Sequence, residues 1–152
     1  MTRSWRRRLL TGLCWFVAFE FAVGAATKFY PGETFFGPPY SVKFVDWGYP
    51  SWFRFVVGAG ELLAAAFLVI PQRRFRFMGA ATLVVILIGA VITHIANRDT
   101  LTESASAPVH LAIAGALAWV TRPADWSQLR TPWRKETPEG VHGRNVATVK
   151  SS

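Results

Sequence analysis

An acidic and a basic side chain share an otherwise apolar stretch of this chain, which runs from residue 52 to residue 70 and ends before Pro71. Arg54 and Glu61 are seven residues apart, so in a helix they lie on one face, and Gly58 between them leaves that face thin. A carboxylate inside a membrane span costs about 2.5–3.5 kcal/mol and is expected to face protein or water, not lipid. Glu61 is therefore a candidate functional residue, although the position would equally suit an acid that only joins helices.

A histidine at the end of another apolar stretch is the second candidate. His94 would exchange protons near neutral pH, and an acid facing an imidazole forms a proton relay or a clamp on a carbonyl ligand. We predict that Glu61 and His94 form the catalytic pair, in direct contact or through a bridging water or ligand atom. Polar residues of four helices are expected to complete a pocket in the outer half of the membrane. The predicted ligand-binding residues are Lys28, Arg54, Thr93, Glu20 and His110.

Metal chemistry is an alternative for the same side chains. Glu20, Glu61, His94 and His110 are of the types that bind metal ions, but no close-spaced ligand motif accompanies them. Haem held by the two histidines is disfavoured because both are expected near a membrane surface. No metal site is predicted. Glu20 also has a simpler interpretation as a helix-packing residue, and His110 as an ordinary interfacial one.

The composition indicates a membrane protein with one domain. Of the 152 residues, 51% are hydrophobic and 17% charged, the mean hydropathy is +0.25, and the apolar residues are gathered in blocks. The net charge of +8 comes largely from basic residues that border these blocks, so it favours a membrane surface over nucleic acid as the partner. The single Cys14 excludes an internal disulfide.

The blocks predict an all-α integral membrane four-helix bundle, with helices at approximately 9–29, 52–70, 77–96 and 105–121. A basic arm, residues 1–8, precedes it, and residues 30–51 form an outer loop, with a short interfacial helix near Val42 to Trp47. Gly89 and Ala90 are expected to let the third helix approach the second closely. The segment 122–152 is interpreted as a basic, largely disordered tail, with Trp126 and Trp133 near the membrane surface.

The charge distribution predicts the topology. With four spans, thirteen of the seventeen Lys and Arg residues lie on one side, which places both termini in the cytoplasm of a bacterial cell with an inner membrane. A basic arm before an apolar block is also typical of a cleaved secretory signal. Glu20, in the middle of this block, argues against that alternative.

Several short motifs in a fixed order resemble the DoxX and DoxX-like family of small four-helix membrane proteins. They are Gly24-x-x-x-Lys28, Trp47-Gly48-Tyr49-Pro50-x-Trp52-Phe53, Gly58-x-Gly60-Glu61-Leu62, Pro71-x-Arg73 and Gly89-Ala90-x-x-Thr93-His94, and the resemblance covers roughly residues 12–120. The founding members of this family are quinone-reducing thiosulfate oxidoreductase subunits, so the resemblance implies an inner-membrane protein for which quinone is a candidate cofactor. The family's polar positions match Lys28, Glu61, Thr93 and His94. The single Cys14 gives no support to sulfur chemistry, and the long loop after the first helix and the basic tail depart from the family's pattern.

Two functions remain open from the sequence. The first is a quinone-linked redox component, in which Glu61 and His94 bind the carbonyl groups and aromatic side chains hold the ring. The second is a non-enzymatic assembly or transport-accessory protein that binds a partner helix or a lipid. The polar cluster favours the first, and the absence of a cofactor motif favours the second, so whether the chain is an enzyme stays open.

Overall fold

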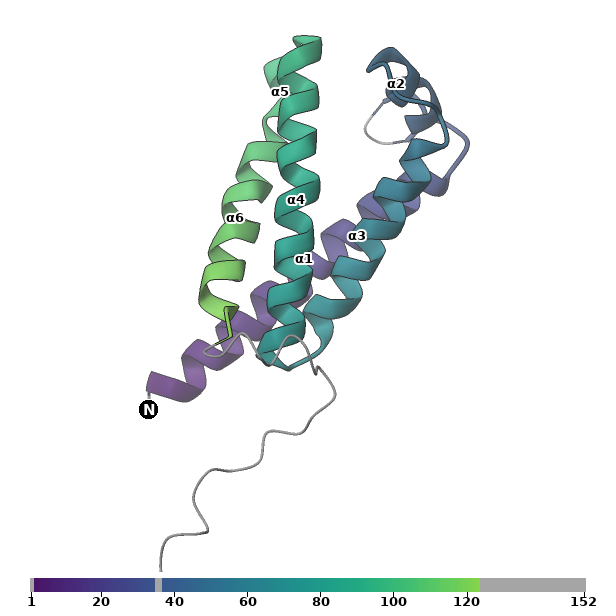
Figure 1. Ribbon diagram of the computed structural model, residues 1–152. Helices are drawn as coiled ribbons and strands as arrows, with labels where there is room; N and C mark the ends of the chain where they lie inside the picture. The colour runs from purple at the N-terminus through teal and green to yellow at the C-terminus, as the bar shows by residue number, and fades with distance from the viewer. Residues whose placement is uncertain (1, 35–36, 124–152) are drawn as a thin grey trace, which may run out of the picture.

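The computed structural model describes residues 2–34 and 37–123, and these residues are almost entirely helical (Figure 1). Four long helices and two short ones follow one another without a β-strand in this part of the chain. In chain order they are α1 (Thr2–Phe29), α2 (Tyr40–Asp46), α3 (Phe53–Val69), α4 (Arg73–Asn97), α5 (Leu101–Ser104) and α6 (Ser106–Thr121). The predicted all-α membrane fold is confirmed.

The residues at the helix ends explain where the helices begin and stop. The first helix begins at Thr2 and therefore includes the basic arm that was expected to precede it, because arginine is a good helix former and no proline interrupts this segment. Pro71 separates α3 from α4, and α4 begins at Arg73, four residues before the predicted start. Arg98, in the left-handed conformation at φ 55°, ends α4. The short helix of the outer loop is Tyr40–Asp46, near the predicted position.

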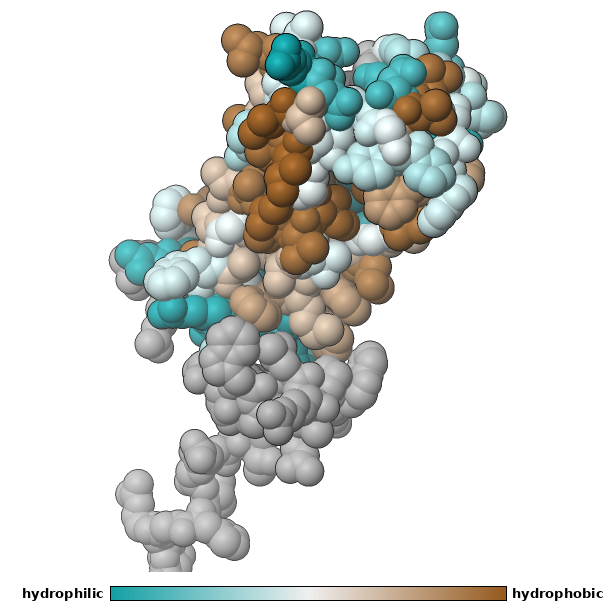
Figure 2. Space-filling view, turned by 45° about the horizontal axis from the view of Figure 1, so that its top comes forward, coloured by the Kyte–Doolittle hydropathy of each residue, from teal (hydrophilic) through white to brown (hydrophobic). Residues whose placement is uncertain are grey.

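Three helical segments are long and apolar enough to cross a membrane: Ser4–Phe29, Arg73–Asn97 and Leu101–Thr121. Helix α3 has 17 residues, about 26 Å at helical rise, and its crossing of the membrane stays a prediction. Large apolar side chains such as Val85, Ile95 and Trp119 are exposed around the molecule. Figure 2 shows the apolar side chains over the middle of the visible face and hydrophilic ones toward its two ends, as lipid contact requires.

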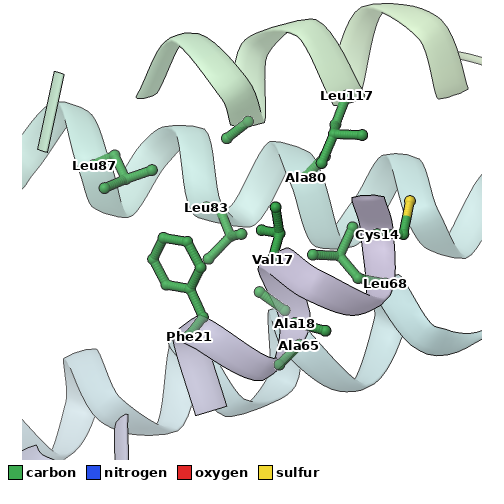
Figure 3. Close-up of a cluster of buried hydrophobic side chains, with 12 residues drawn as sticks. Cys14, Val17, Ala18, Phe21, Ala65, Leu68, Ala80, Leu83, Leu87 and Leu117 are labelled. Carbon is green, nitrogen blue, oxygen red and sulfur yellow. The ribbon is translucent and has the colours of Figure 1, made fainter. Parts of the chain in front are cut away.

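The core lies where α1 crosses the other long helices. Val17, Ala18 and Phe21 of α1 point toward side chains of α3, α4 and α6, among them Leu68, Leu83 and Leu117 (Figure 3). The cluster consists of aliphatic residues, one phenylalanine and Cys14, so it contains no ion pair. The ion pairs of the described chain therefore lie outside this cluster.

A glycine sets the closest approach of α3 and α4. A Cβ atom at Gly79 would lie 2.6 Å from the backbone oxygen of Ala64, so a side chain there would push the helices apart. The expectation that Gly89 serves this purpose was wrong, because nothing lies within 4 Å of the Cβ position at Gly89. The helices are therefore closest near the start of α4, not near its end.

The two ends of the bundle differ in charge. At the basic end, Arg73 Nη2 donates to the carbonyl oxygen of Val120 at 3.0 Å and Arg76 Nη1 donates to Thr11 Oγ1 at 3.1 Å. These contacts join the starts of α1 and α4 to the end of α6, so both ends of the described chain lie on one side (Figure 1). The opposite end, which we call the cap end, is covered by α2 and residues 47–52. The predicted disorder of the tail, with Trp126 and Trp133, lies outside the described residues.

Candidate functional site

A buried ion pair joins α1 to α3 near the cap end. Lys28 Nζ lies 2.8 Å from Glu61 Oε2, and the two residues are only 8% and 6% exposed. The contact has the distance of an ion pair without the alignment of a good hydrogen bond. Lys28 Nζ also donates to the carbonyl oxygen of Gly24 at 3.3 Å. The carboxylate predicted to face protein is thus neutralised by a cation from the neighbouring helix.

Gly58 allows this pair to form. A Cβ atom at Gly58 would lie 2.8 Å from Phe29 Cε2 and 3.4 Å from Lys28 Cβ. The missing side chain therefore lets the last turn of α1 rest directly on α3, one turn before Glu61. Lys28 belongs to that last turn, where the helix dipole also favours a positive charge.

Aromatic side chains close the site from the cap end. The Lys28 ammonium lies 4.8 Å from the centre of the Tyr40 ring, a cation–π contact. Behind Tyr40, the buried Phe44 contacts the rings of Trp47, Tyr49 and Phe53. We call Tyr40, Phe44, Trp47, Tyr49 and Phe53 the aromatic cap; its Tyr40 ring lies against the ammonium of the ion pair.

A second polar cluster fastens the aromatic cap to α4. His94 Nδ1 and Asp99 Oδ2 are 2.6 Å apart, and the Trp47 indole N–H donates to the same Asp99 oxygen at 3.0 Å. The Trp47 and His94 rings meet edge to face, with 5.3 Å between their centres. Asp99 thus links the end of α4 to Trp47 of the outer loop, which lies 52 residues earlier in the sequence.

Thr93 makes the neighbouring link. Its hydroxyl donates to the carbonyl oxygen of Gly89 at 2.9 Å, and Tyr49 Oη lies 3.0 Å from Thr93 Oγ1. Because the Thr93 proton is engaged, Tyr49 is the donor of the second bond. The predicted binding residue Thr93 is therefore buried and holds the cap in place.

The predicted catalytic pair is divided between these two clusters. Glu61 pairs with Lys28, and His94 pairs with Asp99. Among the described residues, no hydrogen bond or ion pair connects Glu61 with His94. A coupling between them through water or a ligand stays a prediction. The chain of rings from Tyr40 through Phe44 to Trp47 connects the two clusters.

Arg54 shares a helix face with Glu61 but does not bind it. Its Nη1 atom donates to the carbonyl oxygen of Tyr30 at 3.3 Å, and its guanidinium lies 4.4 Å from the centre of the Phe55 ring. Two helical turns separate Arg54 from Glu61, and Lys28 of α1 is closer to the carboxylate. These contacts do not support the ligand-binding role expected of Arg54, and that role stays a prediction.

Glu20 and His110 form a third cluster, on α1 and α6. His110 Nε2 lies 3.5 Å from Glu20 Oε2, while its Nδ1 atom lies 2.7 Å from the carbonyl oxygen of Ser106. Glu20, His110, Glu61 and His94 thus belong to three separate clusters. Across residues 2–34 and 37–123, no three His, Cys, Asp or Glu side chains gather in a way that would hold a metal ion.

Three site residues escaped the sequence analysis as functional candidates: Tyr40, Tyr49 and Asp99. Tyr40 and Tyr49 lie in residues 30–51, for which the sequence predicts an outer loop but no role for either tyrosine. Asp99 follows the end of α4, and the left-handed Arg98 turns the chain so that the carboxylate returns to His94. An acid five residues after a histidine at a helix end is a weak signal, but it was present in the sequence.

The Lys28–Glu61 site combines a donor and an acceptor in a dry environment. Lys28 carries three N–H groups, and within the described chain no hydrogen bond reaches Glu61 Oε1. A ligand carbonyl group would require the donor, and a ligand hydroxyl group would suit the acceptor. An aromatic molecule would in addition find ring surfaces in the aromatic cap.

Comparison with known proteins was made at the level of families, curated proteins and solved structures. The family model described as DoxX-like matches residues 12–120. Neither the curated proteins nor the solved structures contain a match. The matched segment runs from the third turn of α1 to the last turn of α6, and it includes all three polar clusters.

Proposed function

Because the chain belongs to the DoxX-like family, we propose that this membrane protein binds a quinone at Lys28 and Glu61 as a component of a quinone-linked redox system. The observation that carries the proposal is the buried Lys28–Glu61 pair beneath the ring of Tyr40. A quinone oxygen accepts a hydrogen bond from Lys28, and a quinol hydroxyl donates one to Glu61. A donor and an acceptor side by side thus suit both redox forms.

The residues of this chain have separate tasks in the proposed site. Lys28 and Glu61 bind the polar edge of the ring and exchange a proton with it. The aromatic cap holds the ring and excludes water, and Asp99 fixes the cap through Trp47 and His94. Electrons come from a partner protein in this proposal, because quinone reduction needs a donor outside these residues.

The proposed setting is the inner membrane of a bacterium, with four spans and both termini in the cytoplasm. The shared side of the two described chain ends supports an even number of crossings. The excess of basic residues at that end supports a cytoplasmic location for it. The Lys28–Glu61 site then lies in the outer half of the membrane.

Extraction of the purified protein tests this function. Protein prepared in mild detergent from quinone-containing membranes is extracted with organic solvent, and the extract is analysed for quinone. Wild-type protein is expected to retain quinone in a stoichiometric amount, and Glu61→Gln to retain much less. Glu103→Gln, the same change at an exposed carboxylate that contacts only the local turn at Thr100, is the control. Equal, trace amounts in all three preparations would argue against quinone binding.

A second function is favoured by the closure of the site. Lys28 and Glu61 already satisfy each other's charge and are more than nine-tenths buried. Such a pair also suits a helix joint in an assembly or transport-accessory protein that binds a partner helix or lipid. In that case protein co-purifies with a membrane partner, and the extract contains no quinone.

A further inference from the structure

A buried arginine at the basic end lacks a counter-ion. Arg76, on the first turns of α4, is 4% exposed. Its Nη1 atom donates to Thr11 Oγ1 at 3.1 Å, while Nε and Nη2 are buried and have no hydrogen-bond partner in the described part of the chain. A buried guanidinium without a counter-ion is strongly unfavourable.

The two free N–H groups form one edge of the guanidinium. Nε and Nη2 together are the donors that arginine presents to a carboxylate or phosphate in a two-point contact. Thr11 occupies Nη1 and so holds the group by its other side. The two free N–H groups can therefore bind one carboxylate or phosphate group together.

No acid of the described chain is placed to fill this edge. The six acidic residues between positions 2 and 123 lie in the middle of α1, in α3 or at the cap end, and they are Glu20, Glu33, Asp46, Glu61, Asp99 and Glu103. The residues around Arg76 are basic instead, and include Arg73, Arg74 and Arg122. The charge at this end therefore calls for an anion from outside the described chain.

The helix adds to the attraction. Arg76 is the fourth residue of the 25-residue helix α4, about 4.5 Å from its start. Side chains near a helix start point back toward it, where the dipole is positive. The start of a membrane helix with a basic turn also lies at the level of the lipid phosphates.

We propose that Arg76 is the centre of a binding site for a phosphate group at the basic end of the bundle. Two phosphate oxygens accept from Nε and Nη2, and the helix start and Arg73 add positive potential. Because both donors are covered, the side chains over them move aside when the anion enters. This site is independent of the quinone proposed at the opposite end.

Thermal unfolding of the full-length protein in detergent, with added ligands, tests the site and separates two phosphate sources. Phosphatidylglycerol represents a lipid headgroup, inorganic phosphate a soluble ion, and diacylglycerol a lipid without phosphate. We expect phosphatidylglycerol or inorganic phosphate to raise Tm in a saturable way and diacylglycerol not to do so. A response to phosphatidylglycerol alone identifies the lipid, and a response to inorganic phosphate identifies the free ion. No response to either overturns the proposal.

Variants locate the effect at Arg76. Arg76→Lys keeps the charge but loses the two-point edge, so the affinity for the active phosphate compound should fall at least about tenfold. Arg98→Lys makes the same exchange at an exposed residue of the cap end and should leave the affinity unchanged. Equal affinities in Arg76→Lys and Arg98→Lys overturn the proposal. If Arg76→Lys does not fold, Thr11→Val is used in its place. Thr11→Val removes the hydrogen-bond acceptor of Arg76 Nη1, so the guanidinium is no longer held in a fixed orientation. A several-fold weaker affinity is expected for Thr11→Val, and an unchanged one overturns the proposal.

Discussion

Lys28 and Glu61 belong to different helices and meet at 2.8 Å, with both side chains almost completely buried. Each charge stabilises the other, since an isolated buried charge is costly. The pair therefore fixes how the last turn of α1 sits on α3. It also places two polar groups beside the aromatic cap, where a ring-shaped ligand would meet them.

Breaking the pair should cost more than removing it. Lys28→Met leaves a buried carboxylate and is expected to destabilise the protein by about 3–5 kcal/mol, and Glu61→Leu leaves a buried ammonium at a similar cost. The double variant removes both charges and should recover most of this loss. Unfolding in detergent, analysed as a double-mutant cycle, measures the coupling. Additive losses would mean that the two charges do not depend on each other.

Two glycines should respond oppositely to alanine. In Gly79→Ala the new methyl group would lie 2.6 Å from the Ala64 carbonyl oxygen, so α3 and α4 must separate and Tm should fall. In Gly115→Ala nothing lies within 4 Å of the new atom, and the higher helix propensity of alanine should leave Tm equal or raised. Equal changes in Tm for both variants would show that the close approach of α3 and α4 at Gly79 does not contribute to stability.

Asp99 should control the order of the aromatic cap. Asp99→Ala removes the acceptor of the Trp47 indole and the partner of His94, a loss of about 1.5–3 kcal/mol for a charged hydrogen bond. Hydrogen exchange in residues 40–49 is then expected to become faster, while the middle of α4 stays protected. Glu103→Gln serves as the control, because Glu103 contacts only the local turn at Thr100. Unchanged exchange in residues 40–49 of Asp99→Ala would show that other contacts hold the cap.

The membrane topology is open to a direct experiment. Reporter domains fused after Asn97 and after Ser152 should report opposite sides, with Ser152 in the cytoplasm. The reason is that Leu101–Thr121, between the two fusion points, is long and apolar enough to cross the membrane. A further fusion after Pro71 should report the cytoplasm and would establish that α3 crosses. Reporters on the same side at Asn97 and Ser152 would remove the last span.

The sequence predicts the positions of the helices but does not decide the partner of Glu61. The apolar blocks have a strong period and a clear length, so the helical elements follow from them. Arg54, on the same face, and Lys28, at the end of α1, were both candidate cations for Glu61, and the choice between them depends on how α1 rests on α3. That packing is decided by Gly58 and Phe29, which are far apart in the sequence. The His94–Asp99 pair likewise depends on one left-handed residue, Arg98, whose conformation a pattern of residue types does not specify.

Quinone binding at Lys28 and Glu61 is the proposal on which the function depends. Its most direct test is a titration of the purified protein with a short-chain ubiquinone, followed by tryptophan fluorescence, with Trp47 in the aromatic cap as a nearby reporter. Wild-type protein is expected to show saturable quenching. Glu61→Gln should weaken the affinity at least about tenfold, a loss of about 1.4 kcal/mol, and Glu103→Gln, the same change at an exposed carboxylate, should leave it unchanged. The same affinity in wild type, Glu61→Gln and Lys28→Met would contradict a quinone site at this pair.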